Sequence, residues 1–222
     1  MLILGIDDAG RGPVIGPMIL AGCLIDDAHY PYLNKLGVKD SKQLTQKRRE
    51  LLEEVIKEKA ESFEVVIIPP KEIDGEGENR VKLNELEAIA AANIINKINK
   101  GFKKIRVVVD CPSIGIAKWT DYLKTKIDNL SNLEIVCEHK ADKNHLAVSA
   151  ASILAKCVRE KEMVKLKERH GDLGSGYPSD PLTKKFLSNN INNKKTSGIF
   201  RKTWSTWKNA SSKLTQKKLG DF

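Results

Sequence analysis

Long apolar runs are absent from this chain of 222 residues. A membrane-spanning helix needs about 20 consecutive apolar residues, so we expect no membrane insertion. Residues 1–6 lead directly into a motif rich in glycine and aspartate, and we therefore expect no signal peptide. The chain also shows no internal repeat, which gives no reason to expect a repeat architecture.

Cysteine is scarce, and the four cysteines form no Cys-x-x-Cys pair. Cys23 and Cys137 lie in apolar, strand-like runs, where a thiol usually serves as a small hydrophobic side chain. His139 and His145 flank Asp142, but their spacing matches no standard zinc pattern. We therefore expect a reduced, cytoplasmic protein without structural zinc.

Acidic residues are almost missing from the C-terminal part of the chain. The formal net charge is +9, and the segment from Thr183 onward carries ten lysines and arginines but a single acid. Such a segment is typical of a protein that binds a polyanion, because each Lys or Arg that neutralises a phosphate releases a counterion. A solvated tail that only improves solubility is the alternative.

With 41% hydrophobic and 30% charged residues, the chain can bury one α/β core. The expected strands cover residues 2–6, 14–25, 63–68, 105–109 and 133–137, and the expected helices begin near residues 45, 84, 116, 145 and 181. This order predicts a mixed sheet flanked by helices. The polar run 188–198 predicts a hinge or exposed loop, so we expect a catalytic domain over residues 1–187 and a basic, helical C-terminal segment over 188–222.

Two local patterns carry further expectations. Asn84, followed three residues later by Glu87, is a capping signature that predicts a helix start. Phe200, Trp204 and Trp207 recur at helical spacing, which predicts a face that packs against the main domain rather than a platform for base stacking.

Acidic residues stand beside several of the expected elements. Asp7 and Asp8 end one apolar strand, Asp110 ends another, and Asp142 precedes a helix-like stretch. Because a crevice forms at the ends of strands in α/β proteins, we expect these carboxylates to share a site. Hard oxygen ligands suit Mg²⁺ or Mn²⁺, and two such ions can promote phosphodiester hydrolysis.

Adjacent residues on a strand point to opposite faces, so Asp7 and Asp8 can share that site only if the chain twists or leaves the strand there. Gly10 and Gly12, which follow, make such a departure easy. From residue types alone, the segment from Gly10 through Arg11 to Gly12 is equally compatible with a plain turn and with a loop that approaches a sugar or phosphate closely.

The motifs together resemble ribonuclease HII of the archaeal type, over residues 2–204 at least. The matching strings are Gly-Ile-Asp-Asp-Ala-Gly-Arg-Gly-Pro (5–13), Asp-Ser-Lys-Gln-Leu (40–44), His-Lys-Ala-Asp (139–142), Val-Ser-Ala-Ala-Ser-Ile-Leu-Ala-Lys (148–156) and Gly-Ser-Gly-Tyr-Pro-Ser-Asp-Pro (174–181). One residue departs from the pattern, because the family usually has glutamate where this chain has Asp8. Aspartate reaches one methylene less far.

The resemblance implies a ribonuclease H-like fold and a metal-dependent endonuclease. Such an enzyme would cut the RNA strand of RNA/DNA hybrids and cut at ribonucleotides embedded in duplex DNA, leaving 3′-hydroxyl and 5′-phosphate ends. It would use Mg²⁺ or Mn²⁺ in a two-metal site. The catalytic and metal-binding residues that the resemblance implies are Asp7, Asp8, Asp110 and Asp142.

The resemblance also implies residues that bind the substrate. The backbone of Gly10, Arg11 and Gly12 would read a 2′-hydroxyl, and Tyr177 would stack on the sugar beside an RNA to DNA step. Without the resemblance, the better interpretation of Tyr177 is a half-buried loop aromatic. Lys42 and Lys140 are expected to contact phosphates, although exposed lysines are often only solvated. These residues are the candidates for specificity.

The last residues are similar to the Gln-x-x-aliphatic-x-x-aromatic peptides that bind sliding clamps. Gln216, Leu219 and Phe222 have the required spacing, because about one tight helical turn places the two apolar side chains on the same side. We therefore expect a sliding clamp as a protein partner, and otherwise a monomer.

Two other functions remain open. Another ribonuclease H-like nuclease, such as a junction resolvase, would differ in substrate, and Asp8 makes a catalytically attenuated hybrid-binding protein conceivable. Ribonuclease HIII is disfavoured, because the motif begins at Gly5 and leaves no space for the additional N-terminal domain of that family.

Overall fold

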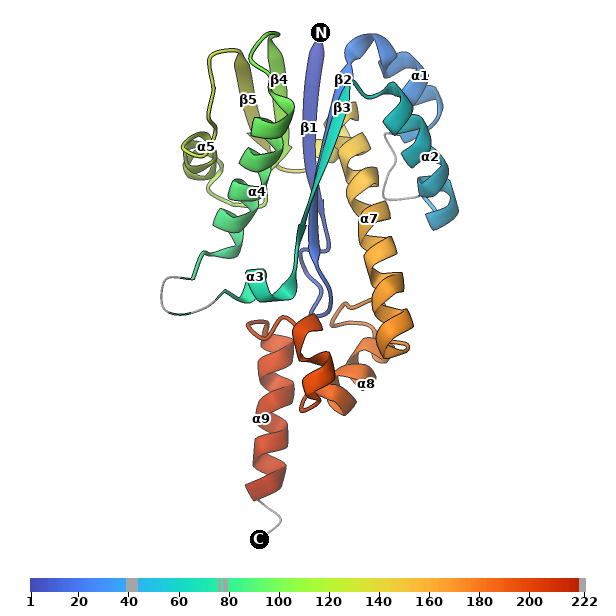
Figure 1. The fold of residues 1–222 in the computed structure, drawn as a ribbon, viewed down its shortest axis with the longest axis vertical. Coiled ribbons are helices and arrows are strands. Elements are labelled where there is room, and N and C mark those ends of the chain that lie inside the picture. Colours follow the sequence, from blue (N-terminus) through green and yellow to red (C-terminus); the bar gives the residue numbers. More distant parts are fainter. Residues whose placement is uncertain (39–43, 76, 78–79, 220–222) are drawn as a thin grey trace. The chain divides into compact units, whose positions relative to one another are not determined.

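The computed structural model describes residues 1–38, 44–75, 77 and 80–219 (Figure 1). The chain forms two compact units. The first comprises residues 1–9, 19–67 and 81–158, and the second comprises residues 10–18, 68–80 and 159–222. The boundary expected between residues 187 and 188 falls inside the second unit.

A five-stranded sheet forms the centre of the first unit. Its strands are β1 (Leu2–Ala9), β2 (Met18–Asp26), β3 (Ser62–Ile68), β4 (Ile105–Asp110) and β5 (Leu133–Glu138), in the order β3-β2-β1-β4-β5. β1 pairs antiparallel with β2 and parallel with β4, and β4 pairs parallel with β5. The expected mixed sheet is therefore confirmed.

The helices are α1 (Tyr30–Lys35), α2 (Gln46–Lys59), α3 (Pro70–Asp74), α4 (Leu83–Ile98), α5 (Ile116–Lys124), α6 (Ala141–Asn144), α7 (Leu146–His170), α8 (Pro181–Asn190) and α9 (Ser205–Leu219). Two short 3₁₀ helices, η1 (Asp27–His29) and η3 (Lys194–Ile199), accompany them. No helix within the described residues is both long enough and apolar enough to span a lipid bilayer.

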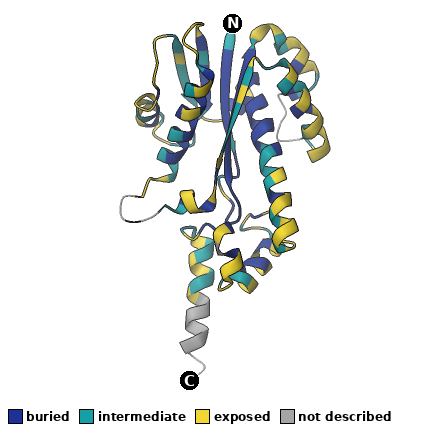
Figure 2. Ribbon diagram, in the orientation of Figure 1, coloured by how far each residue is buried: buried dark blue, intermediate teal, exposed yellow. Residues whose placement is uncertain are grey.

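Helices cover both faces of the sheet in the first unit, and β1 and β2 are buried over most of their length (Figure 2). Two glycines allow close packing. A Cβ added at Gly5 would lie 2.1 Å from the Ala147 carbonyl carbon at the start of α7, and one added at Gly22 would lie 2.3 Å from Ile94 on α4. Because Gly22 pairs with Ile6, the neighbour of Gly5 in the chain, the two glycines face opposite sides of the sheet.

Capping residues explain several helix starts. The Thr45 hydroxyl accepts a hydrogen bond from the Arg48 amide, and the Asp180 carboxylate accepts one from the Leu182 amide, as their positions in the sequence indicate. The expected cap of α4 is wrong. That helix begins two residues earlier than the Asn84 signature suggests, since Glu85 accepts a hydrogen bond from the Lys82 amide at 3.2 Å.

The second unit has its own apolar core, formed by Val14, Ile15, Met163, Leu173, Phe186, Leu187, Ile199 and Phe200. The ring of Phe200 lies 4.8 Å from that of Trp207 and 6.1 Å from that of Phe186. Phe200 forms a β-bridge with Ile15 and precedes α9, so the three C-terminal aromatic residues do not lie on one helix. Phe200 belongs to the core of this unit, and the partly buried Trp204 and Trp207 pack against it.

Candidate active site

Three of the expected aspartates meet where β1 and β4 end. The parallel register pairs Ile6 with Val109, which makes Asp7 and Asp110 the next residues along neighbouring strands. Their side chains therefore share a face of the sheet. Asp7, Asp8 and Asp110 all line one cavity of about 10 Å³, roughly the volume that a single water molecule needs.

Asp8 reaches this cavity although the strand does not bend away between Asp7 and Asp8. β1 continues to Ala9, with Asp7 paired to Ala21 and Asp8 paired to Leu20. Of the two possibilities expected, a twist or a departure from the strand, the departure does not occur. The physical reason is that β4 ends at Asp110, the residue beside Asp7. Carboxylates from opposite faces of β1 can therefore both reach around the end of the sheet.

Asp142 is brought to Asp110 by the short helix α6. The Ala141 amide, at the start of α6, donates a hydrogen bond to Asp110 Oδ1 at 3.1 Å, and Asp142 is the next residue. The Ser149 hydroxyl on α7 donates to the Asp142 carbonyl. Lys140 makes the turn into α6 with a φ of 58°, the only positive φ of a non-glycine residue in the described part of the chain. Asp142 is buried, and the residue before it is hydrogen-bonded to Asp110.

The site is electrostatically unfavourable for carboxylates. Burial raises the pKa of Asp7 well above its ordinary value, and the negative charges of Asp8 and Asp110 raise it further. The Ser152 hydroxyl and the Asp8 amide, which donates to Asp7 Oδ1 at 2.8 Å, act in the opposite direction. A bound cation would reverse this balance, because it favours the ionised carboxylates.

The donor set suits a hard divalent cation, since it consists of carboxylate oxygens at one small cavity. The side chains do not converge into a finished cage, however. Among the described residues, no three His, Cys, Asp or Glu side chains stand close enough together to hold a metal ion. The site therefore fits Mg²⁺ or Mn²⁺ in the chemistry of its oxygen ligands, whereas the described side chains do not form a complete coordination shell.

Sequence reasoning missed one acidic residue of this cavity. Glu87 on α4 is only 2% exposed and lines the cavity together with the three aspartates. The sequence pattern suggested a helix cap for this residue. A signal was available, because Glu87 is spaced four and seven residues from Ala91 and Ile94 and thus lies on the apolar face of α4.

The loop from Gly10 to Gly12 belongs to the second unit, where C-terminal residues hold its backbone. The buried guanidinium of Arg201 donates to the carbonyls of Gly10 at 2.6 Å and Arg11 at 2.8 Å, and also to that of Gly16 at 3.0 Å. The Trp204 indole donates to the Gly12 carbonyl at 3.1 Å. Gly10 has a φ of +80°, a conformation that favours glycine.

Arg201 therefore has a structural role that the charge pattern did not indicate. Its side chain is fully buried, so one of the ten basic residues counted in the C-terminal segment is not available to a polyanion. Lys184, Lys185, Lys194, Lys195, Lys202 and Lys208 are exposed. The basic surface of the described C-terminal residues is thus made of lysines.

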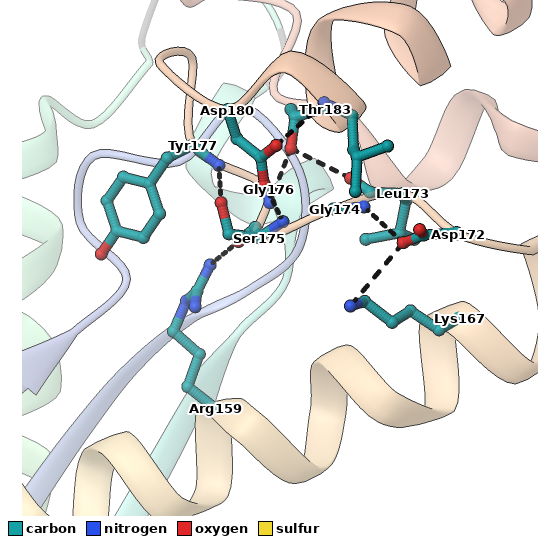
Figure 3. Close-up of polar contacts among 11 residues, drawn as sticks. Arg159, Lys167, Asp172, Leu173, Gly174, Ser175, Gly176, Tyr177, Asp180 and Thr183 are labelled. Atoms are coloured by element: carbon teal, nitrogen blue, oxygen red, sulfur yellow. Dashed lines mark hydrogen bonds and ion pairs between the residues drawn. The ribbon is translucent and has the colours of Figure 1, made fainter. Parts of the chain in front are cut away.

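Tyr177 stands on a hydrogen-bonded turn of the second unit (Figure 3). The Asp180 carboxylate accepts from the Ser175 amide at 2.6 Å, which lowers the pKa of Asp180 to about 2. The Thr183 hydroxyl accepts from the Gly176 amide at 2.9 Å. The Arg159 guanidinium donates to the Ser175 carbonyl and lies 5.2 Å from the Tyr177 ring, which is 41% exposed. The turn thus presents an exposed aromatic ring in a defined position.

The structure gives less detail on the other residues expected to bind the substrate or a partner. Lys140 is exposed and lies next to α6. Gln216 and Leu219 lie in the last part of α9. Lys42 and Phe222 lie outside the described residues.

Comparisons with known proteins identify the fold as that of an endoribonuclease of the ribonuclease H type. Residues 4–207 match the family model for ribonuclease HII. Ribonuclease HII of Methanococcus maripaludis strain C7 is 44% identical over 219 residues, which cover 98% of this chain and 90% of the relative. Ribonuclease HII of Thermococcus onnurineus is 41% identical over 218 residues, which cover 97% and 92%.

Solved structures agree with the sequence relatives. The ribonuclease H2 of Pyrococcus horikoshii OT3 superposes with a TM-score of 0.85 and 36% identity over 97% of this chain and 99% of that one. The PCNA:RNase HII complex from Archaeoglobus fulgidus superposes with a TM-score of 0.80 and 38% identity, over 92% of this chain and 96% of that one. The chain belongs to the ribonuclease HII family.

Proposed function

We propose that this endoribonuclease cleaves the RNA strand of RNA/DNA hybrids and cuts at single ribonucleotides embedded in duplex DNA, leaving 3′-hydroxyl and 5′-phosphate ends. The observation that carries the proposal is the shared cavity of Asp7, Asp8 and Asp110, with Asp142 tied to Asp110 through α6. Membership of the ribonuclease HII family supports the same reaction.

The four aspartates would hold Mg²⁺ or Mn²⁺. Ions bound there would supply an activated water and would neutralise charge on the scissile phosphate. The protein contributes orientation: the Ala141 amide fixes the Asp110 carboxylate, and the Asp8 amide fixes that of Asp7. Ligands that are held by such contacts before the metal arrives lose less freedom on binding.

Most residues assigned to substrate recognition lie in the second unit. The loop of Gly10, Arg11 and Gly12 has its carbonyls held by Arg201 and Trp204, so a rigid backbone is available to read a 2′-hydroxyl. The exposed ring of Tyr177 is suited to stack on a sugar. Exposed lysines, including Lys140 and those of the C-terminal segment, would neutralise phosphates and make binding dependent on salt.

The experiment that tests the reaction is cleavage of a DNA duplex with one embedded ribonucleotide, with Mg²⁺, with Mn²⁺ or with chelator. We expect incision with either metal, loss of incision with chelator, and products with a 3′-hydroxyl and a 5′-phosphate. An all-DNA duplex of the same sequence is the substrate control, and a four-way DNA junction tests for a resolvase. Cutting of the junction in preference to the ribonucleotide would contradict the proposal.

A second function, hybrid binding without efficient cleavage, is favoured by one observation. Position 8 is aspartate in this chain, whereas the family usually has the longer glutamate there. Strong binding of an RNA/DNA hybrid with no turnover in Mn²⁺ would support this alternative and exclude the nuclease.

We also propose that the C-terminal peptide binds a sliding clamp. The related ribonuclease HII of Archaeoglobus fulgidus has been solved in complex with PCNA. In this chain, Gln216, Leu219 and Phe222 have the spacing of a peptide that docks into an apolar groove. Calorimetric titration of the cognate clamp into the full-length protein tests this partner.

A further inference from the structure

Glu87 lies in the cavity of the aspartates but approaches it from a helix. Its side chain is 2% exposed and lines the cavity of about 10 Å³ with Asp7, Asp8 and Asp110. Trp119 of α5 and Ala91 of α4 contribute apolar walls to the same cavity. A carboxylate is costly to bury in such surroundings unless hydrogen bonds or a cation compensate it.

The fold holds Glu87 firmly at this position. α4 packs closely on the sheet because Gly22 leaves room for Ile94, and because its buried face carries Ala88, Ala91 and Ala92. The Trp119 indole donates a hydrogen bond to the Asn84 carbonyl at 2.7 Å, which ties the first turn of α4 to α5. Glu87 lies three residues after Asn84 on the same helix, close to this point of attachment.

Glu87 and Asp8 occupy the same side of β1. Asp8 alternates with Asp7 along the strand and therefore points toward the face that α4 covers, as Ile6 does. Asp8 lines the cavity from β1, and Glu87, whose side chain is one methylene longer, lines it from α4. The two carboxylates can thus bind one water molecule between them, which is what a cavity of about 10 Å³ accommodates.

We propose that Glu87 is a fifth acidic residue of the active site, which positions a divalent cation through a water molecule in the cavity that it shares with Asp8. The inference rests on the proposed function, because it assigns Glu87 to the same metal site. Mg²⁺ keeps several of its waters when it binds to proteins, so a carboxylate that accepts hydrogen bonds from such a water contributes to affinity without direct contact.

The test is the Mn²⁺ affinity of Glu87→Gln, measured by calorimetry without nucleic acid. The variant keeps the volume of the side chain and removes its charge. We expect affinity to fall by about tenfold, which corresponds to about 1.4 kcal/mol. The Mn²⁺ concentration for half-maximal cleavage should rise in parallel. Asp121→Asn is the matched control, because Asp121 is an exposed acid on α5 outside the cavity, and its Mn²⁺ affinity should equal that of the parent.

A purely structural role for Glu87 predicts a different result. Glu87→Gln would then change the urea midpoint but bind Mn²⁺ as tightly as the parent, and this outcome overturns the inference. Glu87→Asp gives an independent test if the glutamine variant is unstable. It keeps the charge but withdraws the carboxylate by one methylene, so it too should lower the affinity, and unchanged affinity again overturns the inference.

The two proposals fail in different ways. If the parent binds Mn²⁺ but cleaves no ribonucleotide-containing duplex, the proposed function fails, and the effect of Glu87 on Mn²⁺ affinity can still be measured. If the parent cleaves and Glu87→Gln binds Mn²⁺ equally well, only the role of Glu87 is lost.

Discussion

Replacing Arg201 with alanine should destabilise the protein more than any other change to a C-terminal basic residue. The guanidinium is fully buried and donates hydrogen bonds to the carbonyls of Gly10, Arg11 and Gly16, at 2.6, 2.8 and 3.0 Å. It also lies 5.0 Å from the Trp204 ring. These contacts join residues about 190 positions apart in the chain, so they close the second unit.

The expected loss of stability follows from the hydrogen bonds that Arg201 donates to the three carbonyl groups. A hydrogen bond from a charged donor contributes about 1.5–3 kcal/mol, and breaking a buried charged network typically costs about 3–5 kcal/mol after desolvation is included. We therefore expect Arg201→Ala to lower the free energy of unfolding by about 3–5 kcal/mol. Arg201→Lys should lower the free energy of unfolding by a smaller amount, but still by more than about 1 kcal/mol. An ammonium group cannot donate to three acceptors with the planar geometry of a guanidinium.

The assay is urea unfolding followed by tryptophan fluorescence and far-ultraviolet circular dichroism. Lys208→Ala is the matched control, because it also removes one positive charge from this segment but from an exposed position, and it should stay within about 0.5 kcal/mol of the parent. A loss below about 1 kcal/mol in Arg201→Ala would refute the assigned role. Deleting everything after Gly198 would remove Phe200 and Arg201 from the core, so such a truncation would not isolate phosphate binding.

Four further outcomes concern activity and binding. Asp110→Asn should lower the cleavage rate by several orders of magnitude with an unchanged circular dichroism spectrum, because it weakens metal binding rather than packing, and near-parental rates would exclude Asp110 from the metal site. Asp8→Glu should cleave as fast as the parent or faster with Mg²⁺, and a clear drop would show that the site is built around the shorter acid. Tyr177→Ala should raise the KM for a duplex with one ribonucleotide, and an unchanged KM would assign the ring no role in binding. Leu219→Ala combined with Phe222→Ala should abolish clamp binding in calorimetry but leave cleavage of short duplexes unchanged, and retained clamp binding would rule the motif out.

Local elements followed from the sequence because their causes are local. Thr45 and the Asp180-Pro181 pair begin helices through contacts within one turn, and Gly171, with a φ of +83°, directly follows α7. The apolar runs that predicted β4 and β5 form strands in the sheet of the first unit. Asp7, Asp8 and Asp110 were recognisable as acids at strand ends because each lies at the end of an apolar run in the sequence.

Relations between distant segments were decided by the tertiary structure. Asp7 and Asp8 share a cavity because β4 ends at Asp110, and no property of residues 5–12 reveals where a neighbouring strand stops. Glu87 looked like a helix cap, but the helix starts earlier, and packing of α4 on the sheet turns this acid into the cavity.

Arg201 gives the clearest contrast between the two levels. By composition it belonged to a basic segment suited to phosphates, yet it is buried against carbonyl groups of a loop near the start of the chain. Carbonyl groups that are shielded from water require a hydrogen-bond donor, and only the folded chain determines which residue supplies it. The sequence by itself thus determined the elements, the acidic residue types and the family, whereas long-range packing decided which side chains meet.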